Sequence, residues 1–124
     1  MPSNPSDFLF TIERHGEVTI LIAGPAIADL DPTMVEDAAA AALEPIRRED
    51  FPLLVVDLEH VAYFGSIFLV ILLRCWKLTS SKGGLMVLCG LTERTREVLR
   101  VTSLDMVWPI YPTRREAIDS LLTD

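Results

Sequence analysis

The chain has 124 residues, half of them hydrophobic, which is enough for one domain with its own core. Its formal net charge of −7 argues against nucleic acid or an anionic membrane surface as a direct partner. The longest apolar run, Ile67–Leu73, is far shorter than the roughly 20 residues that cross a bilayer. Because the N-terminus also lacks a secretion signal, we expect a cytoplasmic protein without membrane insertion.

A β-hairpin is predicted near the N-terminus. Apolar residues alternate from Phe8 to Ile12, which is the period of a strand. His15-Gly16 is a suitable two-residue turn into a second strand, Glu17–Ala23. A connecting loop, Gly24–Asp31, should follow.

The first helix is expected to begin at Asp31 and Pro32, because an acidic N-cap followed by proline is a common helix start. The run VEDAAAAALE that follows is rich in strong helix formers. Pro45 should kink or divide this helix near Glu44 and leave a short piece that ends around Arg48.

The central stretch of the chain runs from a buried strand into a nearly apolar helix. Leu53–Leu58 is a short apolar run, typical of a strand covered on both faces, and Glu59–Gly65 forms a loop. Ser66 then precedes IFLVILLRCWKL and is placed as an N-cap, whose oxygen accepts from first-turn amides. Since a helix N-terminus favours anions, a phosphate on Ser66 would be well placed.

The helix after Ser66 should have one face in water. At about 100° per residue, the solvent side marked by Arg74 and Lys77 is shared by Ser66, Ile67 and Val70. Ile67 and Val70 would then form an exposed apolar rim beside Ser66, which favours a partner surface over two isolated surface hydrophobes. The side chains expected on the opposite, core side are Phe68, Leu72, Cys75 and Trp76.

The last third alternates between strands and helices again. Leu85–Cys89 reads as a second buried strand, and Thr92 caps the helix after it. A short strand is expected within Met106–Tyr111, at a sheet edge because it contains Pro109. Thr113 begins a capping box that opens the final helix.

Together these elements predict the fold class. Strands that alternate with helices after an initial hairpin indicate an α/β sandwich, with a mixed, largely parallel sheet of about five strands packed with about four helices. Residues 1–7 are polar and contain two prolines, so we expect a disordered tail followed by a single domain over residues 8–124.

Catalytic and metal-binding signals are weak. His15 and His60 lie in different loops without metal-ligand spacing, no glycine-rich phosphate loop is present, and no cofactor is expected. Cys75 and Cys89 lie in apolar segments and should be free, buried thiols. A small serine hydrolase that uses Ser66, His60 and a nearby acid is one alternative, but the residues favour a small binding domain.

A family resemblance covers most of the chain. The segment VVDLEHVAYFGSIFLVILLRCWKL is followed by GGLMVLCGL and TERTREVLRVTSLDMVWPIYPTRREAI. From Leu53 to Leu122 this succession resembles the STAS domain, shared by sulfate transporters and bacterial anti-sigma factor antagonists. The family's pattern is an aspartate-ended strand, a hydrophobic loop, and Asp-Ser-Ser-Gly-Leu-Gly opening a helix.

The resemblance implies partner switching. An unphosphorylated antagonist binds an anti-sigma factor that is itself a serine kinase, and phosphorylation of the serine at the helix start ends that binding. Ser66 occupies this position, and Gly65, Ser66, Ile67 and Val70 are the expected partner-binding residues. The implied partner is such an anti-sigma factor or a related regulatory protein, and the sequence leaves a homo-oligomer open.

The chain departs from the family pattern around Ser66. Gly65 replaces the aspartate, Ile67 replaces the second serine, and Phe68 and Val70 replace the two glycines. Two binding functions therefore stay open: an antagonist switched at Ser66, and an interaction or scaffold module that is not switched. The serine hydrolase remains a third, distant alternative.

Overall fold

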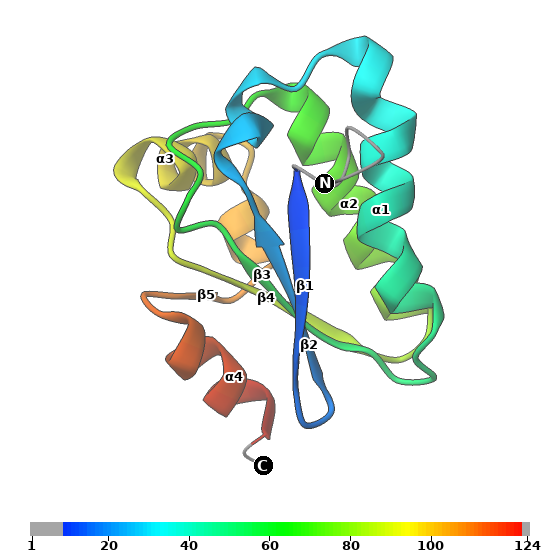
Figure 1. The fold of residues 1–124 in the computed structure, drawn as a ribbon. Helices are drawn as coiled ribbons and strands as arrows, with labels where there is room; N and C mark the ends of the chain where they lie inside the picture. The colour runs from blue at the N-terminus through cyan, green and yellow to red at the C-terminus, as the bar shows by residue number, and fades with distance from the viewer. Residues whose placement is uncertain (1–8, 123–124) are drawn as a thin grey trace.

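A five-stranded sheet in the order β1-β2-β3-β4-β5 forms the centre of the computed structural model, which describes residues 9–122 (Figure 1). β1 runs antiparallel to β2, and every later neighbour is parallel, so the predicted mixed, largely parallel sheet is confirmed. The predicted tail of residues 1–7, like Phe8, lies outside the described residues. The strands are β1 (Phe10–His15), β2 (Val18–Ala23), β3 (Leu53–Asp57), β4 (Leu85–Cys89) and β5 (Ile110–Tyr111).

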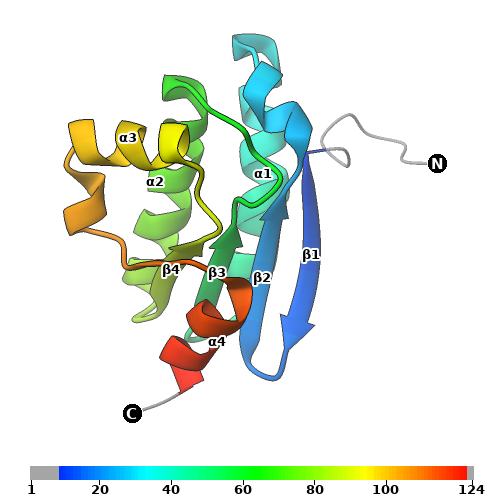
Figure 2. The ribbon, with the colours of Figure 1, turned by 90° about the vertical axis from the view of Figure 1, so that its left-hand side faces the viewer.

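Four α-helices cover the two faces of this sheet, as predicted. They are α1 (Val35–Arg47), α2 (Ser66–Ser81), α3 (Glu93–Val101) and α4 (Arg114–Leu122). Figure 2 shows α4 on one face and the other three helices on the opposite face. Within the described residues, no helix is both long enough and apolar enough to span a bilayer.

β3 and β4 are the central parallel strands, and alternate residues of each are buried on opposite faces. Leu54 and Val56 pack in the core beneath α1 and α2, whereas Val55 packs in a second cluster with Ala117 and Ile118 of α4. Because both faces are covered, the strands lack the polar alternation of a half-exposed sheet. This explains why both were recognisable as continuous apolar runs.

The hairpin turn is displaced by one residue from the prediction. His15 still belongs to β1 and pairs with Val18, so the two turn residues are Gly16 and Glu17. Gly16 has φ +61°, a conformation that glycine adopts without steric cost. The predicted turn at His15-Gly16 is therefore wrong by one position.

The first helix also differs from its predicted bounds. Asp31 accepts a hydrogen bond from the Thr33 amide, but it caps a 3-10 turn, Pro32–Met34, and α1 begins only afterwards. α1 then continues through Pro45 to Arg47, so the predicted division near Glu44 is wrong. Proline removes one hydrogen bond close to the helix end, and the buried Ile46 anchors the last turn in the core.

The last strand is shorter than predicted. Only Ile110–Tyr111 forms β5, because a 3-10 turn, Leu104–Met106, occupies the start of the expected segment. The edge position is confirmed, and the Pro109 carbonyl accepts from the Leu88 amide at 2.9 Å. A proline there costs no ladder bond of its own, since only its carbonyl is used.

Candidate partner-binding surface

Ser66 lies at the N-terminus of α2, where the chain leaves the carboxyl end of β3. The N-cap is Gly65, with φ −107° and ψ −167°, and Ser66 is the first helical residue. The Leu69 amide donates to the Gly65 carbonyl at 3.3 Å, and no side chain caps the helix. The prediction that Ser66 is the N-cap is therefore wrong, because the extended backbone of a cap belongs to the residue before it.

The loop that presents Ser66 is fixed at several points. Val61 and Phe64 are buried, and the Phe64 ring packs edge-on against Phe68 with centroids 5.1 Å apart. The Thr92 hydroxyl donates to the Ala62 carbonyl at 3.0 Å, which ties this loop to the start of α3. Thr92 also caps α3, as predicted, by accepting from the Thr95 amide.

The predicted exposed rim on α2 is confirmed for Val70 and only in part for Ile67. Ser66 is exposed, Ile67 is half-buried, and 47% of Val70 is exposed. Within residues 9–122 the Ser66 side chain makes no hydrogen bond, so its hydroxyl is free to react or to contact another molecule. The solvent side of α2 was therefore correctly read from Arg74 and Lys77.

The core side of α2 is confirmed for three of its four predicted residues. Phe68, Leu72 and Cys75 are buried, but 36% of Trp76 is exposed. Trp76 lies on the flank of the helix, where its ring packs edge-on against Trp108 with centroids 6.4 Å apart. The placement of Trp76 in the core is wrong, because its direction falls at the border of the buried arc.

A hollow of about 250 Å³ lies beside Ser66. Its walls come from the N-terminus of α2, from Tyr63 and Phe64 of the preceding loop, and from the 3-10 helix Pro25–Asp29 that follows β2. The sequence predicts only a connecting loop over Gly24–Asp31, so the 3-10 helix Pro25–Asp29 is a difference from the prediction. Ile27, an apolar residue within this Pro-started 3-10 helix, is buried, and it is the signal that the segment packs inward.

Charged side chains border the loop on the side of α3. The Arg94 guanidinium lies over the Tyr63 ring, 4.7 Å from its centroid, and 39% of Tyr63 remains exposed. A cation held over an aromatic face is attracted by the ring quadrupole. This pair was not predicted, because its two residues lie 31 positions apart.

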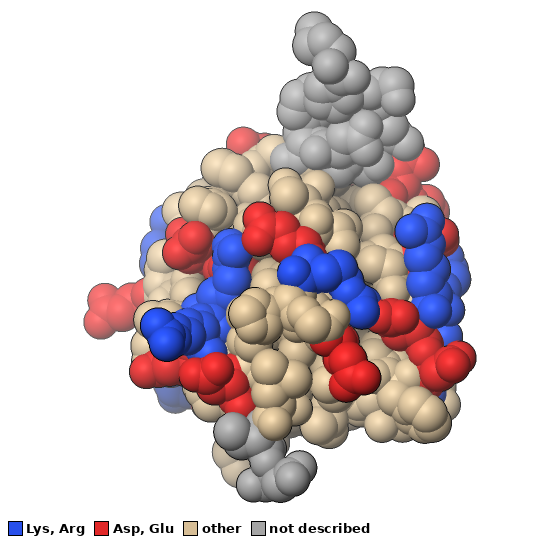
Figure 3. All heavy atoms as spheres, turned by 60° about the horizontal axis from the view of Figure 1, so that its bottom comes forward, with Lys and Arg blue, Asp and Glu red and all other residues tan. Residues whose placement is uncertain are grey.

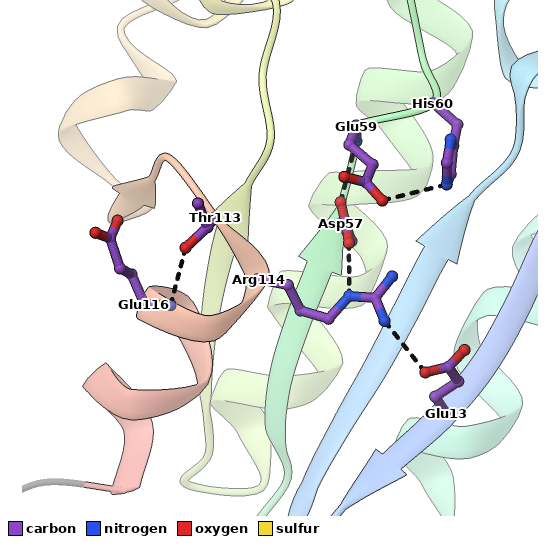
Figure 4. Close-up of polar contacts among 7 residues, drawn as sticks. All are labelled: Glu13, Asp57, Glu59, His60, Thr113, Arg114 and Glu116. Atoms are coloured by element: carbon purple, nitrogen blue, oxygen red, sulfur yellow. Dashed lines mark hydrogen bonds and ion pairs between the residues drawn. The ribbon is translucent and has the colours of Figure 1, made fainter.

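Asp57, at the end of β3, is a buried charge that anchors the loop from behind (Figure 4). Its Oδ2 accepts from Arg114 Nε at 2.8 Å, and its Oδ1 accepts from the Glu59 amide at 3.0 Å. Arg114 also reaches Glu13 of β1 at 3.1 Å. The hydrogen bond to Asp57 raises the pKa of Arg114 above its ordinary value, so the cation is permanent.

The neighbourhood of Asp57 also constrains Gly90 and Cys89. Gly90 has φ +73°, and a Cβ there would lie 2.9 Å from the Glu59 amide nitrogen. Burial, followed by the adjacent Asp57 carboxylate, raises the pKa of the Cys89 thiol to about 12. Cys75 and Cys89 are both free and buried, as predicted.

Acidic and basic side chains alternate around the hairpin and α4. Figure 3 shows both signs side by side on the lower face of the molecule, without a continuous patch of either. Ion pairs account for part of this pattern, among them Arg14–Glu49 and Arg114–Glu13. At the N-terminus of α4, Thr113 accepts from the Glu116 amide at 3.2 Å, which is the predicted cap.

The side chains that a serine hydrolase would need beside Ser66 contact other residues instead. His60 Nε2 lies 3.3 Å from Glu59 rather than against Ser66, and Asp57 is held by Arg114 (Figure 4). A general base must come within hydrogen-bond reach of the hydroxyl that it activates. Within residues 9–122, no three His, Cys, Asp or Glu side chains group as metal ligands.

Comparisons with known proteins place this architecture in a family. The model of the STAS domain matches residues 11–117. The chain is 28% identical over 78 residues to an anti-sigma F factor antagonist of Paenibacillus polymyxa, a match that covers 63% of this chain and 67% of that protein.

Two solved structures share the fold. An anti-sigma-factor antagonist (STAS) domain protein from Planctomyces limnophilus is 31% identical, with a TM-score of 0.83 over 92% of this chain and 98% of that one. A putative anti-sigma factor antagonist from Thermotoga maritima, 21% identical, has a TM-score of 0.81 over 97% of this chain and 100% of that one. The chain belongs to the STAS domain family.

Proposed function

We propose that this protein is an anti-sigma factor antagonist, which acts by binding a partner protein rather than by catalysis. The observation that carries the proposal is the exposed Ser66 at the start of α2, beside Val70 and the hollow. The names of the Paenibacillus and Planctomyces relatives support the same function. The contact surface comprises Gly65, Ser66, Ile67 and Val70.

Phosphorylation of Ser66 is the proposed switch. The modification adds about −1.5 to −2 charges at pH 7. No side chain caps α2, so its first-turn amides are available to phosphate oxygens, and the helix N-terminus tolerates the charge. A partner packed on Ile67 and Val70 would have to desolvate that charge, which opposes binding. The family resemblance implies that the partner is an anti-sigma factor with serine kinase activity, or a related regulator.

A second candidate is a STAS module that binds a partner without being switched. Gly65 favours it, because the residue before Ser66 offers no carboxylate to orient the hydroxyl or to accept its proton. The two candidates share the contact surface and differ only in the modification of Ser66.

Binding of purified serine-kinase anti-sigma factors from the same genome, measured by calorimetry, tests the contact surface. Val70→Glu should weaken binding at least tenfold and leave the melting temperature unchanged, because it adds a charge at the interface and not in the core. Leu122→Glu is the matched control: 49% of Leu122 is exposed, it also lies on a helix, and α4 covers the opposite face of the sheet. If none of these factors binds the wild type, the proposed function is wrong.

Incubation with the bound factor and ATP, followed by mass spectrometry, separates the two candidates. Phosphate on Ser66 together with loss of binding identifies the switched antagonist, and Ser66→Asp should then bind weakly while Ser66→Ala binds normally. An unmodified Ser66 combined with a binding defect in Val70→Glu identifies the unswitched module. Normal binding by both Val70→Glu and Ser66→Asp would show that the surface is misplaced.

A further inference from the structure

A row of apolar side chains continues along α2 beyond the proposed contact surface. Val70, Leu73 and Trp76 are 47%, 37% and 36% exposed, and their spacing of three residues places them on one side of the helix. Val107, 41% exposed, extends the row, because it lines the same 340 Å³ hollow as Trp76. We call Val70, Leu73, Trp76 and Val107 the α2 stripe.

The stripe is held in place from below and from the side. The Trp76 ring rests edge-on against Trp108, which is 1% exposed, and α1 is tied to the other flank of α2 by the Arg74–Glu36 pair at 3.6 Å. Figure 2 shows α2 between α1 and α3. A fixed, partly exposed tryptophan costs little conformational entropy on binding and is a common anchor at protein interfaces.

The charges on α2 indicate what would cover the stripe. The chain has 18 acidic and 11 basic residues, yet α2 contains two basic residues and no acidic one. Arg74 is paired with Glu36, whereas Lys77 is exposed and makes no ion pair within residues 9–122. Charge complementarity therefore favours a partner whose surface opposite Lys77 is acidic.

We propose that the α2 stripe receives an acidic amphipathic helix of the same partner that contacts Ser66, an inference that rests on the proposed function. Val70 belongs to both surfaces, so the two contacts are continuous. Val70 and Trp76 are six residues apart, a rise of about 9 Å along α2, which nearly two turns of a partner helix would cover. Helices dock on such surfaces through apolar anchors spaced three or four residues apart.

The test is calorimetry of the full chain with the bound anti-sigma factor. Leu73→Glu and Lys77→Glu should each weaken binding at least tenfold, and the Lys77→Glu defect should shrink at high salt. The controls are Leu122→Glu and Arg115→Glu on α4, which make the same changes on the opposite face and should bind as the wild type does. Tryptophan emission should shift to shorter wavelength on binding, and Trp76→Phe should lose that shift.

Three results would overturn the proposal. If Val70→Glu blocks binding while Leu73→Glu and Lys77→Glu bind normally, the stripe is not used and the proposed function still stands. If the isolated chain sediments as a dimer that Leu73→Glu dissociates, a second copy of the chain occupies the stripe instead. If no anti-sigma factor binds the wild type, the proposed function fails and this inference fails with it.

Discussion

The guanidinium of Arg114 lies 2.8 Å from the carboxylate of Asp57, so the first residue of α4 neutralises the last residue of β3. The Asp57 side chain is 2% exposed and the Arg114 side chain 31%. The same carboxylate accepts the Glu59 amide, at the start of the loop that leads to Ser66. The helix on one face of the sheet thus supports the loop that carries the proposed switch.

Loss of this cation should destabilise the fold. Arg114→Met leaves Asp57 buried without its charge partner, and we expect the free energy of unfolding to fall by roughly 2–4 kcal/mol, somewhat less than for a fully buried pair. Urea denaturation measures the change, with Arg115→Met as the exposed control on the same helix. Adding Asp57→Asn to Arg114→Met should restore part of the loss. A difference below about 0.5 kcal/mol between Arg114→Met and wild type would contradict this account.

A charge in the centre of β3 should lower the free energy of unfolding far more than a charge at the exposed first residue of β4. Val55 is fully buried against the residues of α4, so Val55→Asp places an unpaired carboxylate in an apolar core and should cost more than about 4 kcal/mol. Leu85→Asp, at the 57% exposed first position of β4, is the control and should cost under about 1 kcal/mol. Thermal melting checks both, and an unchanged melting temperature for Val55→Asp would refute the placement of β3.

Ser66→Ala should have little effect on stability. Since Gly65 is the cap and the Ser66 hydroxyl makes no hydrogen bond, we expect a change within about 0.5 kcal/mol, rather than the ~1 kcal/mol of a lost N-cap. Urea denaturation decides between the two values. A loss near 1 kcal/mol would mean that the hydroxyl caps α2 in solution.

Gly65→Asp should be tolerated and mildly stabilising. The backbone at Gly65 has φ −107°, and a Cβ there would meet no atom within 4 Å. The new carboxylate can accept from first-turn amides, and the unfolded chain loses entropy, so we expect a gain of about 0.5 kcal/mol. Gly90→Asp is the contrasting control, because φ is +73° and backbone lies 2.9 Å away; it should be strongly destabilising. Equal stability of the two variants would be inconsistent with the structure.

The two buried thiols should make stability fall at alkaline pH. Burial raises the pKa of Cys75 and of Cys89 from 9.0 to about 12. Between these values the unfolded chain releases thiol protons and the folded chain keeps them, so the contribution is intact below pH 9 and is lost as the pH rises toward 12. Each thiol should add a slope of about 1.4 kcal/mol per pH unit in that range. Urea denaturation at several pH values should show a shallower slope for the Cys75→Ala/Cys89→Ala variant, and identical slopes would argue against burial.

Most of the fold could be predicted because burial leaves a periodic pattern. β3 and β4 are apolar on both faces, and the wet and core sides of α2 follow from its charged residues. The errors fall where one residue decides the local geometry. The hairpin turn lies one residue later than predicted, at Gly16-Glu17, where Gly16 has a positive φ. α1 continues through Pro45 instead of dividing there, and the buried Ile46 packs its last turn in the core.

The partner-binding surface was predicted only in part. The reason differs from the one that explains the errors in the fold. Exposure of Ser66 and Val70 follows from helical spacing within one element, whereas the remaining features depend on contacts between distant segments. Arg114 is 57 residues from Asp57, and the hollow beside Ser66 is completed by the 3-10 helix after β2. No local pattern in a single sequence reports such contacts.

The open space around Gly65 also affects how readily this position could mutate to aspartate during evolution. Two of the four glycine codons, GGT and GGC, become aspartate codons through one nucleotide substitution, and a Cβ at this position would meet no atom within 4 Å. The family carboxylate before the serine is therefore one point mutation away in a gene that uses either codon. A STAS protein with this N-cap can gain or lose a carboxylate directly before its serine without first passing through an unstable form.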